Sequence, residues 1–380
     1  MRLVFIAHDS ELTGASKSML ALVEGLHQKG HQIWLMIPEE GKLSQESEKK
    51  GFKVKISGHR TNTLPKNHQK LPLWVRLKQV KFSFQKVGIN KLLAFRLEKE
   101  IRAFNVDYII TNTSTTYFGY YLAKQSGVPH IWYIREFGAK DHGFIPFRFD
   151  SYKSYLKNSK YVVLISSCLQ DYYNSQYALY NTKVIYNGVY TLKELEEKGD
   201  VLKLPQTIPT FIFVGQLTVS KGIWQFVKAI HTLCQEQSCK ANILGEGDQY
   251  ESVKDYIKEN NLQNNINMRG YVSEPELYYK TSDCFIMASQ SEAFGRTTIE
   301  AAVNKCFIIA NRNGATKELF ADGEEALFYD GSKRGLLLKI KSYLSLSSGE
   351  KNQMIDKAQK KVLYSFKVEN MVDNFEKILE

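Results

Sequence analysis

The sequence is poor in cysteine and proline and contains no long apolar run. It has 5 Cys and 8 Pro among 380 residues. The cysteines are odd in number and form no Cys-x-x-Cys pair, so neither disulfides nor structural zinc are expected. No apolar run approaches the roughly 18 residues of a membrane span. The first residues, MRLVFIAHDS, have an apolar stretch too short for a signal-peptide core, which predicts a first strand and a cytoplasmic protein.

Acidic residues are scarce in the first half of the chain. Residues 1–190 hold 27 Lys and Arg against 14 Asp and Glu, whereas residues 191–380 hold 24 against 26. Within residues 51–102, 13 basic residues accompany only Glu98 and Glu100. This excess indicates an anionic partner for the first half. The overall composition, 43% hydrophobic and 24% charged, is that of a globular protein and excludes a disordered chain or a coiled coil.

Short β-branched runs alternate with longer helical patterns, which is typical of parallel sheets covered by helices. We therefore predict an α/β protein with two doubly wound Rossmann-like domains facing a central cleft. The first domain is residues 1–190, and the second is residues 191–364. A C-terminal helix of about 365–380 is expected to pack back on the first, and a charged passage at 192–209 is the predicted linker. The predicted strands are 3–7, 32–37, 53–56, 108–111, 130–134, 161–165 and 183–185, then 210–214, 241–244, 266–269, 284–287, 307–310 and 326–328.

A glycine-containing turn, SQSEAFGRTTIE at residues 289–300, joins a predicted strand to a predicted helix. Such a turn presents unpaired backbone N–H groups and the positive end of the helix dipole, which together suit a phosphate group. Glu292 precedes the turn, and Glu300 lies on the helix, where a carboxylate suits the hydroxyls of a ribose. The alternative is that both acids lie on a solvated helix face.

The string EAFGRTTIEA resembles the signature of the retaining nucleotide-sugar glycosyltransferases with the GT-B fold, specifically glycosyltransferase family 4 of the bacterial cell-surface polysaccharide type. Other stretches agree in the right order, and the likeness covers most of residues 180–330 and the first half loosely. They are VIYNGV, FVGQLTVSKGIWQFVKAI, LGEGDQ, RGYVSEPELYYKTSDCFI and NGATKELFADGEEALFY. The family's usual glycines stand as Lys305 and Ala315 here, which weakens the match locally.

The resemblance implies a site for the donor diphosphate. Lys221 of VSKG matches the lysine that neutralises the phosphates, and a point cation with rotatable donors suits that role. Gln216 stands where the family most often has an arginine, so that phosphate binding must depend more on backbone N–H groups. These are the N–H groups of Phe294, Gly295, Arg296 and Thr297.

The rest of the donor is matched in the same way. Glu300 matches the carboxylate that binds the ribose, and Glu292 matches the one that contacts the donor sugar near the anomeric carbon. Val272 matches the position whose main chain meets the nucleobase. Gly14, in the loop TGASKS after the first strand, resembles the family's loop facing the diphosphate, although an ordinary turn before a helix explains it as well.

The first domain departs from the family at one position. Many members have a histidine and an acid directly after the strand that follows a Val-Pro turn. In this chain the corresponding segment reads WYIREF, so Arg135 and Glu136 stand at those two positions. Arg135 cannot act as a general base because a guanidinium does not deprotonate, so an electrostatic role remains. His8 and His130 are expected at strand ends near the cleft, each as a lesser candidate for substrate contact.

No cofactor or metal is implied by the sequence. No Asp, Glu or His cluster has metal-ligand spacing, and the Asp-x-Asp of metal-dependent sugar transferases is missing. The mixture of Phe and Leu with Lys and Arg in residues 76–104 fits either a segment lying on an anionic membrane or a solvated basic helix face. No nucleic-acid-binding pattern accompanies it.

We therefore expect a nucleotide-sugar-dependent hexosyltransferase acting on a glycan or lipid-linked acceptor, with Glu292, Lys221 and Arg135 as catalytic residues. It is expected in the cytoplasm, with peripheral contact to the inner face of the membrane through residues 51–104. The alternatives are a sugar-nucleotide epimerase or phosphorylase on the same fold, or an inactive scaffold that binds membrane or nucleic acid.

Overall fold

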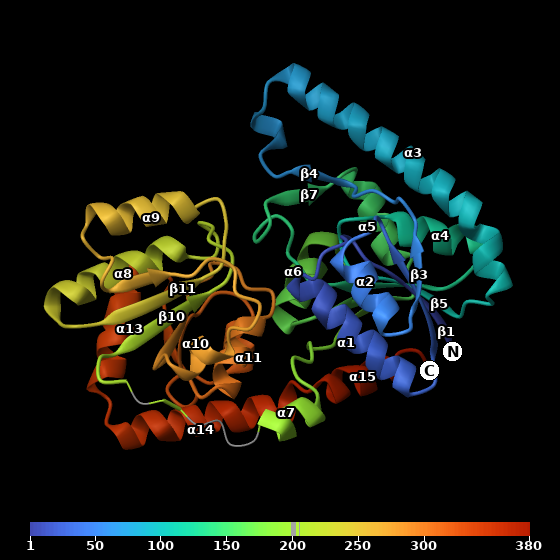
Figure 1. Ribbon diagram of the computed structural model, residues 1–380. Coiled ribbons are helices and arrows are strands. Elements are labelled where there is room, and N and C mark those ends of the chain that lie inside the picture. The colour runs from blue at the N-terminus through green and yellow to red at the C-terminus, as the bar shows by residue number, and fades with distance from the viewer. Residues whose placement is uncertain (199–202, 205) are drawn as a thin grey trace. The chain divides into compact units, whose positions relative to one another are not determined.

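The chain forms two compact units, each built around one parallel sheet (Figure 1). Unit 1 comprises residues 1–188 and 368–380, and unit 2 comprises residues 189–367. The computed structural model describes residues 1–198, 203–204 and 206–380. The predicted linker at 192–209 opens with helix α7 (Leu192–Lys198), and its residues 199–202 and 205 lie outside the described residues.

The sheet of unit 1 has seven parallel strands in the order β3-β2-β1-β5-β6-β8-β9. The central strands are buried on both faces, as their continuous apolar runs predict. Their bounds are β1 (Arg2–Ile6), β2 (Gln32–Ile37), β3 (Lys53–Ile56), β5 (Tyr108–Thr111), β6 (His130–Ile134), β8 (Tyr161–Leu164) and β9 (Thr182–Val184). Each lies within one residue of its predicted range.

Helices cover this sheet and include the C-terminal one. They are α1 (Gly14–Gln28), α2 (Lys42–Lys49), α3 (Leu73–Ala103), α4 (Phe118–Ser126), α5 (Phe149–Lys157), α6 (Ser167–Tyr177) and α15 (Val368–Glu376), with a short 3₁₀ turn, η1 (His68–Lys70). Helix α15 lies beside α1 (Figure 1), where Lys29 pairs with Glu376 and the Phe5 and Phe375 rings are 6.1 Å apart. The chain end therefore belongs to the fold of unit 1.

The sheet of unit 2 has six parallel strands in the order β12-β11-β10-β13-β14-β15. They are β10 (Thr210–Val214), β11 (Lys240–Leu244), β12 (Ile266–Met268), β13 (Cys284–Met287), β14 (Phe307–Asn311) and β15 (Leu327–Tyr329). The helices are α8 (Ile223–Glu236), α9 (Tyr250–Glu259), α10 (Glu276–Lys280), α11 (Arg296–Val303), α12 (Thr316–Leu319), α13 (Lys333–Ser345) and α14 (Ser348–Ser365). Both units thus have the predicted α/β architecture.

Two features of the fold differ from the sequence-based expectation. Strands β4 (Thr63–Pro65) and β7 (Phe144–Pro146) form a small antiparallel sheet that no pattern indicated. Cys234 and Cys239 are joined by a disulfide, so the expectation of unpaired cysteines was wrong there: the end of α8 and the start of β11 bring their Cα atoms to 5.6 Å, within the range a disulfide needs.

Among residues 1–198, 203–204 and 206–380, no helix has both the length and the apolar character that a membrane span requires.

Candidate functional site

In unit 2, the loops that follow the carboxyl ends of the strands are packed against each other through glycines. A Cβ on Gly222 would lie 2.0 Å from the backbone oxygen of Ala288, and one on Gly314 would lie 2.5 Å from that of Glu292. Both glycines have positive φ, +79° and +85°. Only glycine combines this conformation with so close an approach. The loops after β10, β13 and β14 are thereby held together at one edge of the sheet.

This packing brings Lys221 and Glu292 into contact across 71 residues of sequence. Lys221 Nζ donates to Glu292 Oε2 at 2.9 Å, and the side chains are only 24% and 14% exposed. Glu292 is fixed by its backbone, because its oxygen accepts from the Ala315 N–H at 2.8 Å. A cation and a carboxylate are thus both positioned at the carboxyl edge and largely shielded from water.

Helix α11 starts beside this pair. Gly295 precedes its first residue with φ +99°, a left-handed conformation that aims the first turn of N–H groups out of the loop. On the helix, Arg296 Nε donates to Glu300 Oε1 at 2.9 Å. The carbonyl of Thr297 accepts from the Tyr279 hydroxyl at 3.3 Å. The turn predicted at residues 289–300 therefore exists, with Glu300 one helical turn after the amides.

The other residues predicted for the donor lie on loops at the same edge. Gln216, after β10, is exposed, and Val272, after β12, is half-buried. The Phe294 ring is buried and lies edge-on to that of Phe366 at 5.8 Å, so this residue can offer a ligand only its backbone. Ala315, where a glycine was expected, has φ −76° and needs none.

In unit 1, Arg135 and Glu136 directly follow strand β6 and are both buried. Arg135 Nε donates to Asn112 Oδ1 at 2.8 Å, its Nη1 donates to Asn187 Oδ1, and its guanidinium lies 4.2 Å from the centre of the Tyr133 ring. The guanidinium is thereby held in place by residues that follow β5 and β9 and by a ring of β6. Asn112 and Asn187 were not predicted, although Asn187 lies within the VIYNGV segment.

The Glu136 carboxylate is the acceptor of a compact hydrogen-bond group. Its Oε1 accepts from Thr113 Oγ1 at 2.9 Å and from the N–H and hydroxyl of Ser114 at 2.6 and 2.7 Å. Its Oε2 accepts from the Arg135 N–H at 3.1 Å. Both buried oxygens of this carboxylate thus have hydrogen-bond donors.

His8 and Asp9 follow β1 at the same edge of unit 1. His8 Nε2 lies 3.1 Å from Asp9 Oδ2. Burial works to lower the pKa of His8, but the hydrogen bond and charge of Asp9 outweigh it, so that this pKa is raised. Asp9 also accepts from the Ser16 hydroxyl at 2.9 Å, which ties it to the start of α1. Gly14, the first residue of that helix, is exposed, with open space where a Cβ would be.

His130 does not lie where it was expected. It begins β6 rather than ending it, so it is at the opposite edge of the sheet from Arg135. Its ring bonds with Thr111 Oγ1 at 2.8 Å and Ser159 Oγ at 2.9 Å, and complete burial lowers its pKa to about 3. His130 is therefore a neutral core residue.

In the part of the chain that the structure describes, no group of three or more His, Cys, Asp or Glu side chains could hold a metal ion.

Comparisons with known proteins agree with this architecture. The family model described as "Glycosyltransferase Family 4" matches residues 12–191, and the one described as "Glycosyl transferases group 1" matches residues 195–362. The Anabaena protein HepE, crystallised with UDP and glucose, has a TM-score of 0.76 and 16% identity, covering 100% of this chain and 99% of that one. The fold is thus that of the GT-B glycosyltransferases, and the chain belongs to glycosyltransferase family 4.

Two curated relatives illustrate the range of the family. The 2-deoxystreptamine N-acetyl-D-glucosaminyltransferase of Niallia circulans is 27% identical over 186 residues, which are 48% of this chain and 44% of that enzyme. The alpha-monoglucosyldiacylglycerol synthase of Acholeplasma laidlawii is 21% identical over 84% of this chain and 82% of that enzyme. The chain spans less than half the length of several of the curated relatives that it matches.

Proposed function

We propose that the protein is a retaining glycosyltransferase that moves a hexose from a nucleoside-diphosphate donor to a hydroxyl of a glycan or lipid-linked acceptor. The observation that carries this proposal is the Lys221–Glu292 pair beside the first turn of α11. A half-buried cation next to the amides of a helix start is suited to a diphosphate. UDP in the similarly folded Anabaena structure gives the class of ligand.

Binding of the diphosphate would exchange the partners of Lys221. The ammonium group turns from Glu292 to the phosphate oxygens, where the N–H groups of 294–297 assist it, and the exposed Gln216 adds a neutral donor. Glu292 is then released from its ion pair and is available to the hydroxyls of the donor sugar. One event thus prepares both the leaving-group site and the sugar site.

The nucleoside would be held by residues of the same sheet edge. Glu300, whose Oε1 accepts from Arg296, would accept from the ribose hydroxyls, and the main chain of Val272 would contact the base. The roles proposed for Glu300 and Val272 are based on the family resemblance and on the location of both residues at the carboxyl edge of the sheet.

In unit 1, Arg135 would stabilise negative charge rather than move a proton. Its guanidinium is fixed by Asn112 and Asn187, and it stays charged at every physiological pH. Gly14, with open space around its backbone, would approach the donor phosphates. We propose a reaction without a resident metal, in which Lys221 and the α11 amides would stabilise the leaving phosphate, and this phosphate helps to deprotonate the acceptor.

We also propose that unit 1 meets an anionic membrane surface through α3 and the residues before it. The range 73–97 contains six basic and no acidic residues. Trp74, Leu73 and Leu77 are between 61% and 70% exposed at the start of the helix. Apolar side chains beside cations are typical of an interfacial segment. Such contact would place the enzyme at the inner face of the membrane, and the Acholeplasma relative, which is named as a synthase of alpha-monoglucosyldiacylglycerol, makes a lipid acceptor chemically reasonable.

A thermal-shift screen against UDP, GDP, ADP, CDP and dTDP tests the proposal, because a ligand that binds only the native state raises its melting temperature. We expect one or two of them to stabilise the protein, and Lys221→Met to abolish the shift while Lys228→Met, an exposed lysine on the adjoining helix, retains it. No shift with any nucleotide would refute the proposal. Incubation with the matching nucleotide sugar then distinguishes transfer from the formation of a free epimer or a sugar phosphate.

A further inference from the structure

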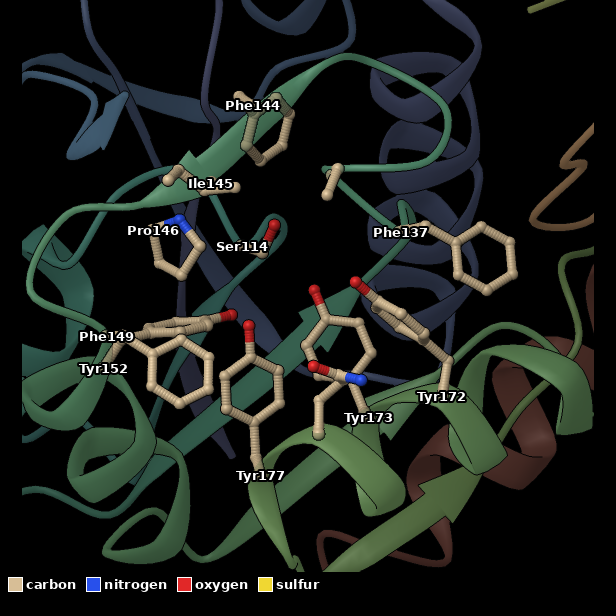
Figure 2. A pocket seen from close by; sticks show the side chains of 13 residues that line it. Ser114, Phe137, Phe144, Ile145, Pro146, Phe149, Tyr152, Tyr172, Tyr173 and Tyr177 are labelled. Carbon is tan, nitrogen blue, oxygen red and sulfur yellow. The ribbon is translucent and has the colours of Figure 1, made fainter. Parts of the chain in front are cut away.

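Unit 1 contains a pocket of about 200 Å³ that the donor site does not use (Figure 2). It lies between the loop around β7, the start of α5 and the side of α6. Its walls are largely aromatic, and no charged side chain is among the described residues that line it. They are Ser114, Phe137, Gly138, Ala139, Phe144, Ile145, Pro146, Phe149, Tyr152, Tyr172, Tyr173, Gln176 and Tyr177.

Hydroxyl groups from four tyrosines converge on this space. Figure 2 shows the oxygens of Tyr152, Tyr172, Tyr173 and Tyr177 directed toward the middle of the pocket, with Phe144, Ile145 and Pro146 opposite them. The tyrosine hydroxyls thus face an apolar wall across the pocket.

The tyrosines are held rigidly. Tyr152, Tyr173 and Tyr177 are 1%, 2% and 5% exposed, and the Tyr177 ring lies 5.4 Å from that of Tyr152 and 5.3 Å from that of Tyr173. Burial raises the pKa of each of these phenols, so they are neutral hydrogen-bonding groups at physiological pH. The geometry is therefore set before any ligand arrives.

One of these hydroxyls is incompletely satisfied. The Tyr152 hydroxyl is buried and, in the described part of the chain, makes no hydrogen bond of normal geometry, although it interacts with the neighbouring Tyr173 hydroxyl. Leaving a buried hydroxyl unsatisfied is unfavourable, so a ligand that bonds to it is favoured. By contrast, Tyr173 donates to the Glu136 carbonyl at 3.3 Å, and Ser114 donates to the Glu136 carboxylate. The pocket thus adjoins the buried Arg135–Glu136 group.

The lining decides between three kinds of ligand. An anion finds no cation inside, because Lys140 lies over the Phe137 and Tyr172 rings, at 5.5 and 4.6 Å, rather than in the lining. A purely apolar group would leave the Tyr152 hydroxyl without a good hydrogen bond. A neutral sugar ring offers C–H faces to the aromatic walls and hydroxyls to the tyrosines. Size agrees, since an apolar cavity of about 150 Å³ holds benzene, one unsubstituted six-membered ring.

We propose that this pocket binds one uncharged pyranose ring of the acceptor, with Tyr152 and Tyr177 as its specificity-determining hydrogen-bonding residues. The inference rests on the proposed function, because it names the part of the acceptor that unit 1 recognises.

Ligand-observed saturation-transfer NMR on the full chain tests this pocket. The probes are the methyl glycosides of glucose, galactose and N-acetylglucosamine, with glucose 6-phosphate and cyclohexanol as charged and apolar comparisons. We expect at least one methyl glycoside to bind and Tyr152→Phe and Tyr177→Phe each to weaken it about fivefold, the loss of one hydrogen bond. Tyr180→Phe is the matched control, because Tyr180 is 92% exposed and outside the lining.

Two outcomes would overturn the proposal: no methyl glycoside binds, or cyclohexanol or glucose 6-phosphate binds as well as the glycosides and is indifferent to the two substitutions. Nucleoside diphosphate binding, measured on the same samples, reports separately on unit 2. A protein that binds the nucleotide but no glycoside refutes only the pocket, and one that binds a glycoside but no nucleotide refutes the proposed transferase function.

Discussion

At the scale of single residues, the candidate site consists of charges that are already paired before a ligand binds. Lys221 is bonded to Glu292, and Arg296 to Glu300. Half-buried charges of this kind are tolerated only with partners. A diphosphate donor would replace one set of partners by another, which keeps the site stable in both states and makes nucleotide binding depend on the ammonium group of Lys221.

The core histidine His130 predicts an acid-sensitive unit 1. Burial lowers its pKa to about 3 from 6.5, so only the unfolded state takes up its proton in this interval. The contribution of neutral His130 to the unfolding free energy is fully present above about pH 6.5 and is lost as the pH falls. The unfolding free energy of the parent protein should fall as the pH is lowered from about 7.5 to about 5. In His130→Gln we expect this fall to be smaller by about 2 kcal/mol, as measured by urea denaturation at the two pH values. Equal pH dependence in both proteins would contradict the assignment.

At the scale of elements, strands were predictable to within a residue while several contacts between elements were not. Strands such as β2 and β13 are buried on both faces, so each shows an uninterrupted apolar run. Strands β4 and β7 are three residues long, contain proline and carry no such signal. Helix α3 has apolar residues on its exposed side as well, which obscures helical periodicity.

Some features of the candidate site were likewise predictable from the sequence, and others were not. The carboxyl-edge loops were predictable because parallel strands end at one edge of a sheet, and the motif at 289–300 marks one of them. The Lys221–Glu292 contact depends on backbone packing at Gly222 and Gly314, which sequence spacing does not encode. His130 was misplaced because it starts its strand, and Asn112 was missed because a lone asparagine carries no motif.

Helix α11 ends in an unfavourable conformation that one substitution should relieve. Lys305 has φ +56°, while its N–H and that of Cys306 bond to the Ala302 and Ala301 carbonyls. This is a helix C-terminal motif that favours glycine. We expect Lys305→Gly to stabilise unit 2 by about 1 kcal/mol in thermal unfolding. Lys228→Gly, inside α8, should instead destabilise it by about 1 kcal/mol; a loss of stability in both variants would contradict this explanation.

Gly314 is the glycine of the site that packs directly against the backbone of Glu292. An alanine there would place its Cβ 2.5 Å from the Glu292 oxygen and displace Glu292. Gly323 is a matched control, with φ +78° and nothing within 4 Å. We expect Gly314→Ala to lower the initial rate of sugar transfer at least tenfold more than Gly323→Ala, which carries only the backbone strain of about 1 kcal/mol. Equal rates would show that the Glu292 position is unimportant.

At the scale of the whole molecule, the net positive charge and many of the exposed apolar side chains belong to unit 1. Its basic excess lies in the range 51–102, and α3 adds Trp74 and Phe95, 70% and 64% exposed. Unit 2 is close to neutral and carries the residues that we propose for donor binding. The basic surface that we propose for membrane contact therefore belongs to unit 1.

Vesicle co-sedimentation measures the membrane contact. We expect binding to vesicles that contain phosphatidylglycerol, little binding to phosphatidylcholine alone, and a decrease with added salt. Trp74→Ala should weaken binding, and Lys78→Gln and Lys81→Gln should each weaken it about fivefold. Leu338→Ala is the control, an apolar side chain 55% exposed on α13. Binding that ignores lipid charge and these substitutions would leave α3 as a solvated basic helix.

The most direct test of the account is the initial rate of nucleoside diphosphate release from the preferred donor by the parent protein, Lys221→Met and Lys228→Met. The account predicts that Lys221→Met loses a factor of about 100 to 1,000, as expected when a group stabilising the departing charge is removed, while Lys228→Met keeps its rate. A Lys221→Met protein that turns over its donor as fast as the parent would contradict the central claim that this lysine and the start of α11 bind the diphosphate.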